Sequence, residues 1–301
     1  MDLDEIIEGL MRGERRALAR AITIIEEGAE AEKILGRIPE AKPRLVVGVT
    51  GPPGSGKSTL IGVLAKEFAS RGVRVGVIAV DPSSRITGGA VLGDRVRMMD
   101  AGTMEGIYIR SLATRGGGSI SEAAENVIRV MAAAGIDMVF IETVGSGQHD
   151  LEVLASSDII LLVLSTGTGD EIQGLKSGLA EVSDIIVVNK ADRPGAESLL
   201  TGLRIAFPDK SERILKVSAA RSEGVKRLTD LIEEYMGRKV RRDKKIEREI
   251  LVEKAMMGLR RLVEEEAEKY LEKHRPRSRE HAVEEIIRQV LKRIVGHEGE
   301  G

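Results

Sequence analysis

Short apolar runs alternate with segments of helical spacing through the central part of the chain. The apolar runs predict strands at residues 44–50, 73–80, 106–110, 137–142, 158–164, 184–189 and 213–218. Helical spacing predicts helices at residues 57–70, 94–101, 120–134 and 223–236. Strands that alternate with helices are typical of the α/β class, so we expect a mostly parallel sheet with helices on both faces. In such sheets, ligands bind beyond the carboxyl ends of the strands.

Both ends of the chain carry helical patterns of another kind. Apolar residues at helical spacing, interrupted at Gly13, predict two amphipathic helices near the N-terminus. The C-terminal part is rich in charge and has an apolar stripe between Ile246 and Leu271, which can pack on its own domain or on a second subunit. We therefore expect an N-terminal helical extension at 1–40, an α/β domain at 41–237 and a C-terminal helical arm at 238–301.

Composition narrows the class of protein. The net charge of the 301 residues is −2 and charges of both signs are interspersed, so no basic face indicates nucleic acid or a membrane surface as a partner. The chain has no cysteine and only four scattered histidines, which excludes disulfides and thiolate metal sites. Since there is no membrane-spanning apolar run and no basic secretion signal, we expect a soluble, cytoplasmic protein.

One motif indicates a nucleotide. Residues 51–58 read Gly-Pro-Pro-Gly-Ser-Gly-Lys-Ser between an apolar run and a helical pattern, which is a complete G-x-x-x-x-G-K-S phosphate loop. Its small residues let backbone N–H groups point at phosphates, Lys57 adds a point charge, and the Ser58 hydroxyl is expected to bind Mg²⁺. The predicted contacts are Gly51, Pro52, Pro53, Gly54, Ser55, Gly56, Lys57, Ser58 and Thr59.

A second motif identifies the base. The strand predicted at 184–189 leads into an N-K-x-D sequence that ends at Asp192. The carboxylate of Asp192 can accept hydrogen bonds from guanine N1–H and from the exocyclic amine, which adenine does not offer in that arrangement. A backbone N–H after the strand at 213–218 is expected to reach the guanine oxygen. The predicted base-side contacts are Asn189, Lys190, Asp192, Ser218, Ala219 and Ala220.

Three carboxylates are candidates for a magnesium site. Asp81 follows one predicted strand, Asp94 begins a predicted helix, and Glu142 ends another strand. Mg²⁺ takes one or two carboxylates and keeps several waters. Asp81 and Asp94 can instead cap the elements that they begin. Glu142 stands where GTPases usually have Asp in a D-x-x-G element; it can hold a metal-bound water or orient the attacking one, and Gly145 can sense a γ-phosphate.

Four segments together carry a specific resemblance: residues 80–84, 87–98, 142–148 and 169–176. They closely resemble the MeaB/ArgK family of P-loop GTPases, which are associated with methylmalonyl-CoA mutase and related adenosylcobalamin-dependent acyl-CoA mutases. With residues 7–23, the resemblance extends over nearly the whole chain. Glutamate at the position of Glu142 is the rule in that family.

The resemblance implies a SIMIBI-type P-loop GTPase that uses GTP and Mg²⁺, gates cofactor loading into a mutase and protects the mutase. It also implies a homodimer through the C-terminal arm. Besides Lys57 and Glu142, it implies a catalytic role for Lys176, which would swing toward the phosphates and neutralise developing charge. Asp170 and Gln173 would support that switch loop. From the residues alone, Lys176 would be a solvated lysine.

Other function classes share parts of the pattern. A metallochaperone GTPase for another metalloenzyme shares the fold, but it usually carries a Cys/His cluster that this chain lacks. A kinase-like phosphotransferase, the activity behind the ArgK name, needs an acceptor site, and no His-Arg-Asp element is present. A scaffold that binds GTP without hydrolysis is the third alternative, which acceleration by a mutase would exclude.

Overall fold

The structure is a computed structural model that describes residues 1–28, 30–80, 104–112, 120–143, 154–166, 178–237, 244–273 and 278–296. The helix predicted at 94–101 lies outside these residues. Contacts divide the chain into two compact units, Met1–Ile246 and Glu247–Gly301.

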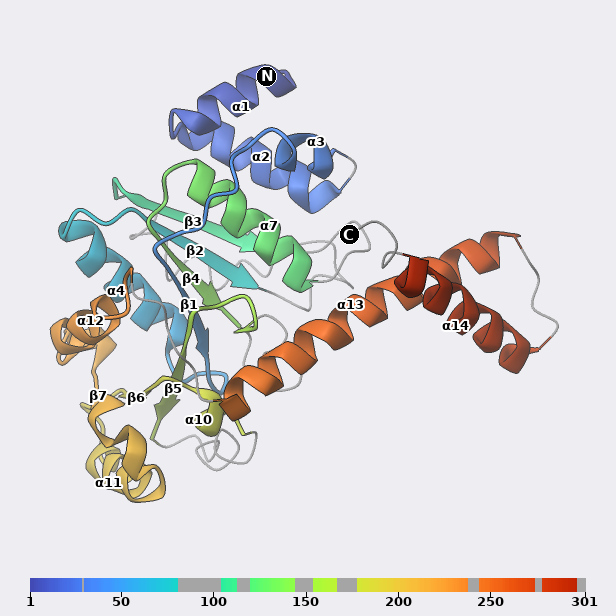
Figure 1. Cartoon of the computed structure of the whole chain (residues 1–301). Coiled ribbons are helices and arrows are strands. Elements are labelled where there is room, and N and C mark those ends of the chain that lie inside the picture. Colours follow the sequence, from blue (N-terminus) through green and yellow to red (C-terminus); the bar gives the residue numbers. More distant parts are fainter. Residues whose placement is uncertain are drawn as a thin grey trace. The chain divides into compact units, whose positions relative to one another are not determined.

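The strands of the first unit form one parallel sheet in the order β3-β2-β4-β1-β5-β6-β7 (Figure 1). They are β1 Leu45–Thr50, β2 Val75–Val80, β3 Ile107–Leu112, β4 Met138–Glu142, β5 Ile159–Ser165, β6 Ile185–Asn189 and β7 Ile214–Lys216. Each apolar run therefore forms a strand near its predicted position, and the predicted parallel sheet is confirmed. In the middle of the sheet, Val47 of β1 pairs with Phe140 of β4 on one side and with Ile159 of β5 on the other.

The helices of the first unit agree with the predicted pattern in part. They are α1 Leu3–Met11, α2 Arg15–Glu27, α3 Ala31–Leu35, α4 Lys57–Ser70, α7 Ile120–Ala133, α10 Leu179–Val182, α11 Ala196–Ala206 and α12 Val225–Glu233, with 3-10 turns η1 Pro208–Arg213 and η2 Ala219–Arg221. The predictions missed α3, α10 and α11. Both α3 and α10 are too short to show helical periodicity, and Gly202 weakens the pattern of α11.

Alternation along the strands divides the core between the two faces of the sheet. Val47 and Phe140 pack on one face with α4 and α12, while Val46 and Ile141 pack on the other with α2 and α7 (Figure 1). Successive strand residues point to opposite faces. Because helices cover both faces, the central strands are apolar at nearly every position, which is the pattern that made them visible in the sequence.

The N-terminal helices are part of this core. A capping box starts α1: the Glu5 N–H donates to the Asp2 carboxylate at 2.8 Å, and the Asp2 N–H donates to the Glu5 carboxylate at 3.0 Å. A turn at Gly13 leads into α2, as predicted, and Leu18 and Ile22 of α2 are buried in the same apolar cluster as residues of α7. The N-terminal extension therefore belongs to the layer of helices on one face of the sheet.

A third apolar cluster lies where α10 and α11 cover β5 and β6, and a buried lysine lies beside it. The ammonium of Lys210 in η1 donates to the carbonyls of Ala180 at 3.0 Å, Ser183 at 2.8 Å and Glu181. These carbonyls end α10, where a helix leaves its acceptors without intrahelical donors. Burial lowers the pKa of Lys210, while the three acceptors stabilise its charged form.

The second unit is a pair of helices, α13 Lys244–Lys273, which begins just before it, and α14 Arg279–Gly296. The Arg293 guanidinium of α14 donates to Glu265 at 2.6 Å and to Glu266 at 3.2 Å, which joins α14 to α13. Large apolar side chains are exposed on both helices: Leu251, Val252, Met256, Leu259, Val263, Leu271, Val283, Ile287, Leu291 and Ile294. Among the described residues, neither these helices nor any others combine the length and apolarity needed to cross a bilayer.

Replacing Lys210 by Met is expected to lower the free energy of unfolding by about 2 kcal/mol or more, because three buried carbonyls lose a charged donor. Urea unfolding measures the change. Lys216→Met is the matched control: Lys216 pairs with Glu197 at the surface, so a change below about 0.5 kcal/mol is expected. Equal effects of the two substitutions would contradict a special role for the Lys210 contacts.

Candidate nucleotide site

The phosphate loop connects β1 to α4 in the centre of the sheet. Two of its glycines are required by geometry as well as by function. At Gly51, with φ of 141°, a Cβ would lie 2.0 Å from the Val163 carbonyl oxygen of β5. At Gly56, with φ of 92°, a Cβ would lie 2.5 Å from the amide nitrogen of Asn189. A side chain at Gly51 would displace the backbone of β5, and one at Gly56 would displace the Asn189 side chain, so both positions require glycine.

Lys57 begins α4 and is buried, although it carries a charge. Its ammonium donates to the carbonyls of Gly51 at 2.8 Å and Pro52 at 3.2 Å. The charge is therefore held inside the curve of the loop, beside the N-terminal end of the helix and its positive partial charge. A buried ammonium at this place attracts phosphate oxygens, which are stronger acceptors than neutral carbonyls.

Ser58 and Glu142 meet beside the loop. The Ser58 hydroxyl donates to the Glu142 carboxylate at 2.6 Å. Glu142 is buried at the end of β4, and it pairs in register with Val49 of β1, the strand that carries the loop. Parallel pairing of β1 and β4 thus delivers the carboxylate to the phosphate loop.

These two oxygen donors fit Mg²⁺, which prefers carboxylate, hydroxyl and phosphate oxygens and needs only one or two carboxylates from protein. In the described part of the chain there is no group of three or more His, Cys, Asp or Glu that can hold a metal. Asp81 and Asp94, the other carboxylates predicted for a magnesium site, lie outside the described residues.

Asn189 joins the three loops of the site. It ends β6, is almost fully buried, and its amide nitrogen donates to the Ser55 carbonyl in the phosphate loop at 2.9 Å. Its amide oxygen accepts from the Ala219 N–H, after β7, at 3.2 Å. The next residue, Lys190, has φ of 55° and donates from its ammonium to the Gly54 carbonyl. Both residues were predicted as base-side contacts. Their hydrogen bonds to carbonyls of the phosphate loop were not predicted.

Ser218 holds the predicted base reader. Its buried hydroxyl donates to the Asp192 carboxylate at 2.6 Å, and this hydrogen bond is the main reason that the pKa of Asp192 is lowered. Asp192 is exposed and ionised at neutral pH, as a guanine reader must be. Ser218 therefore orients the Asp192 carboxylate, a contact that spacing in the sequence did not reveal.

The described site residues lie at the carboxyl ends of β1, β4, β6 and β7 and in the segments that follow these strands. Within this group Pro53, Gly54, Thr59, Asp192 and Ala220 are exposed, while Ser55, Lys57, Glu142, Asn189 and Ser218 are buried. Six predicted site residues lie outside the described part of the chain: Asp81, Asp94, Gly145, Asp170, Gln173 and Lys176.

Asn189→Ala is expected to cost about 2 kcal/mol or more of the free energy of unfolding, because a buried carbonyl and a buried N–H lose their partner. Denaturant unfolding of the nucleotide-free protein measures it. Ser55→Ala serves as the control, since the contact uses the Ser55 carbonyl and the buried Ser55 hydroxyl has no partner among the described residues. A stable Asn189→Ala protein would show that the loops hold together without this side chain.

Comparison with known proteins shows which family the chain resembles. A family model described as methylmalonyl Co-A mutase-associated GTPase MeaB matches residues 18–276. A Pyrococcus abyssi protein named as a GTPase is 43% identical over 267 residues, which are 82% of each chain. The GTPase ArgK of Escherichia coli is 38% identical over 240 residues, 74% of this chain and 72% of that one.

A solved structure described as an LAO/AO transport system kinase has a TM-score of 0.65 and 26% identity to this chain, and the match covers 97% of both chains. The parallel sheet, the phosphate loop and the N-K-x-D loop form the fold of the P-loop GTPases. The predicted fold class is therefore confirmed. The chain belongs to the family of methylmalonyl Co-A mutase-associated GTPases, MeaB.

Proposed function

We propose that this GTPase is a chaperone of an adenosylcobalamin-dependent acyl-CoA mutase of the methylmalonyl-CoA mutase type, gating cofactor loading and protecting the mutase. Membership of a mutase-associated family supports the partner. The observation that best supports the nucleotide chemistry is the joining of the phosphate loop to the base-reading loops through Asn189. With these loops held together, GTP binds with its two ends in fixed positions, which favours a defined position of the γ-phosphate.

Guanine selectivity follows from the Asp192 carboxylate. The Ser218 hydroxyl donates to one carboxylate oxygen of Asp192. The remaining lone pairs of this carboxylate can accept hydrogen bonds from guanine N1–H and from the exocyclic amine. Adenine would leave this ionised group without donors, which is costly once the base covers it.

For hydrolysis, Lys57 exchanges its contacts with Gly51 and Pro52 for phosphate oxygens and neutralises their charge. Ser58 and Glu142 would hold Mg²⁺, with Asp81 and Asp94 as further candidates from the sequence. When bound, the ion would neutralise charge that develops on the β- and γ-phosphates. Glu142 also orients the attacking water from its buried position, and Gly145 senses the γ-phosphate.

The segment at 169–176 is proposed as a partner-dependent switch on the strength of its family motif. Lys176 approaches the phosphates when the mutase binds, and Asp170 and Gln173 support the loop. A cation added at this stage stabilises the charge of the transition state, which makes turnover depend on the client.

The C-terminal arm is proposed as the contact of a homodimer in the cytoplasm. Its two helices expose apolar side chains, among them Leu259 and Val263 of α13 and Ile287 of α14. Exposed apolar residues repeated along a helix pair favour burial against another apolar surface. A second copy of the arm offers such a surface.

Asp192→Asn is expected to weaken GTP binding at least about tenfold, because the amide presents a donor where guanine also presents one. Xanthosine triphosphate carries an oxygen in place of the guanine amine, so it is expected to bind the variant better than the wild type. Fluorescent-nucleotide competition measures both affinities. Asp209→Asn, at an exposed aspartate of η1, should bind GTP like the wild type. Unchanged GTP selectivity in Asp192→Asn would place the base elsewhere.

Adding an adenosylcobalamin-dependent mutase from the same source is expected to accelerate GTP hydrolysis, with Lys176→Ala losing most of the acceleration and keeping the basal rate. Phosphate release is measured with and without the mutase. Lys226→Ala, at an exposed lysine of α12, is the matched control and should be accelerated normally. Lack of acceleration by such mutases would contradict the proposed client, and transfer of phosphate to an acceptor in place of its release would favour a phosphotransferase.

A further inference from the structure

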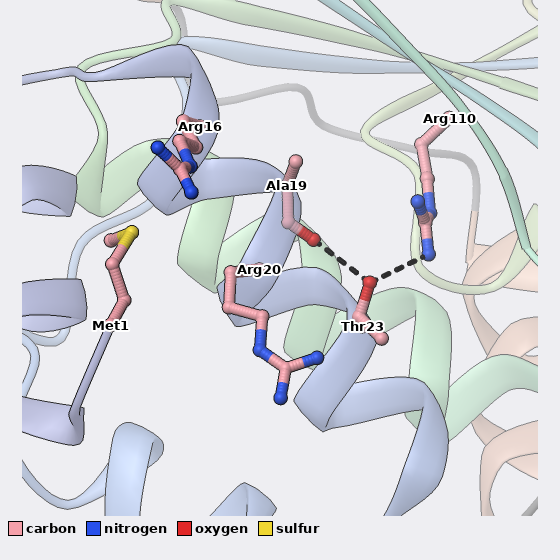
Figure 2. Close-up of a pocket in the computed structure, with 6 residues that line it drawn as sticks. All are labelled: Met1, Arg16, Ala19, Arg20, Thr23 and Arg110. Atoms are coloured by element: carbon pink, nitrogen blue, oxygen red, sulfur yellow. Dashed lines mark hydrogen bonds between the residues drawn. The ribbon is translucent and has the colours of Figure 1, made fainter.

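A cavity of about 470 Å³ lies between the N-terminal helices and the edge of the sheet, and none of its lining residues belongs to the nucleotide loops. It is lined by Met1, Arg16, Ala19, Arg20, Thr23 and Arg110 (Figure 2). Four of these residues come from α2, and Arg110 comes from β3, the edge strand next to β2. Three of the six are arginines and none is acidic.

Arg16 and Arg20 are one helical turn apart on α2, so their side chains share one face of the helix. Both are exposed. Within the described residues, neither forms a hydrogen bond or an ion pair. The pKa of Glu30 is lowered mainly by its hydrogen bond from Lys33, and the charge of Arg20 makes a smaller contribution. The guanidinium groups of Arg16 and Arg20 therefore keep their donors available to a ligand.

Two side chains of α2 hold the guanidinium group of Arg110 in place. Its guanidinium donates to the Thr23 hydroxyl at 3.1 Å and to the Glu26 carboxylate, and Thr23 in turn donates to the Ala19 carbonyl at 3.0 Å (Figure 2). These contacts set the plane of the guanidinium group. The Nε of Arg110 is buried and has no hydrogen-bond partner among the described residues. Because this atom is buried, a ligand in the cavity would contact the guanidinium through a terminal nitrogen.

The charges around the cavity do not cancel. Glu26 compensates Arg110, and Glu30 lies toward Arg20, but Arg16 has no carboxylate partner in the described part of the chain. Guanidinium groups bind phosphate oxygens through two parallel hydrogen bonds, which makes clustered arginines typical of phosphate recognition. The volume lies within the range of about 300–1,000 Å³ that is usual for small-molecule sites.

We propose that this cavity binds a phosphate-bearing small molecule, held by Arg16, Arg20 and Arg110, with Met1 and Ala19 contacting its less polar part. The guanidinium of Arg110, which Thr23 and Glu26 hold in place, favours a compact ligand that reaches into the cavity over an acidic protein segment, which would contact Arg16 and Arg20 from the surface. The site is separate from the phosphate loop and does not depend on the proposed mutase partner.

The test is calorimetric titration of inorganic pyrophosphate into the full chain saturated with GDP and Mg²⁺, so that the phosphate loop is already occupied. One further site is expected. Arg16→Gln and Arg20→Gln should each weaken pyrophosphate binding about tenfold or more, because each loses a charge-assisted contact. Arg20→Lys should weaken it less, since it keeps the charge but loses the planar pair of donors.

Arg12→Gln is the matched control, because Arg12 is an exposed arginine of the same helix pair and does not line the cavity. It should leave pyrophosphate affinity within about twofold. GDP affinity and thermal unfolding should be the same in all variants, since the substituted arginines are exposed and distant in sequence from the nucleotide loops.

Three results would overturn the proposal. The first is the absence of pyrophosphate binding to the GDP-loaded protein. The second is an equal loss of affinity in Arg12→Gln, which would indicate general attraction by the surface charge. The third is tight binding of a hexaglutamate peptide without binding of pyrophosphate, which would assign the arginines to contact with an acidic protein.

Discussion

The contacts of one buried amide hold the nucleotide site together. Asn189 donates to the phosphate loop and accepts from the loop after β7, so three segments that are far apart in the sequence share one side chain. A buried amide that lost either partner would leave a costly unpaired group, and the three loops therefore keep their relative positions. Recognition of phosphate and recognition of base become parts of one rigid arrangement.

The sheet makes that arrangement possible. All seven described strands run parallel, so the carboxyl ends of β1, β4, β6 and β7 lie at one edge and bring their loops together. Helices pack on both faces of the sheet and bury the strands. The N-terminal extension belongs to the helical layer on one face. The phosphate loop lies close to β5 at Gly51 and close to Asn189 at Gly56, so neither glycine has room for a side chain.

Several polar side chains of the site form hydrogen bonds with other groups of the site. Lys57 is held by loop carbonyls, Ser58 by Glu142, and Asp192 by Ser218. In the proposed complex, a nucleotide and its metal would replace the contacts of Lys57 and Ser58 with stronger, charged ones, whereas the Ser218 contact would persist and orient Asp192. The site is thus preorganised, which reduces the reorganisation that binding requires.

The sequence by itself determined the parallel α/β fold, most helix positions, the phosphate loop and the base-reading motif, because each depends on local periodicity or on residues that are close together in the chain. It did not reveal α10 and α11, the bridge from Asn189 to Ser55, the hold of Ser218 on Asp192, or the cavity at Arg110. These features join residues as much as 134 positions apart, or helices too weakly patterned to stand out. Only the tertiary structure decided them, because strand order and packing, rather than spacing along the chain, determine which distant side chains meet.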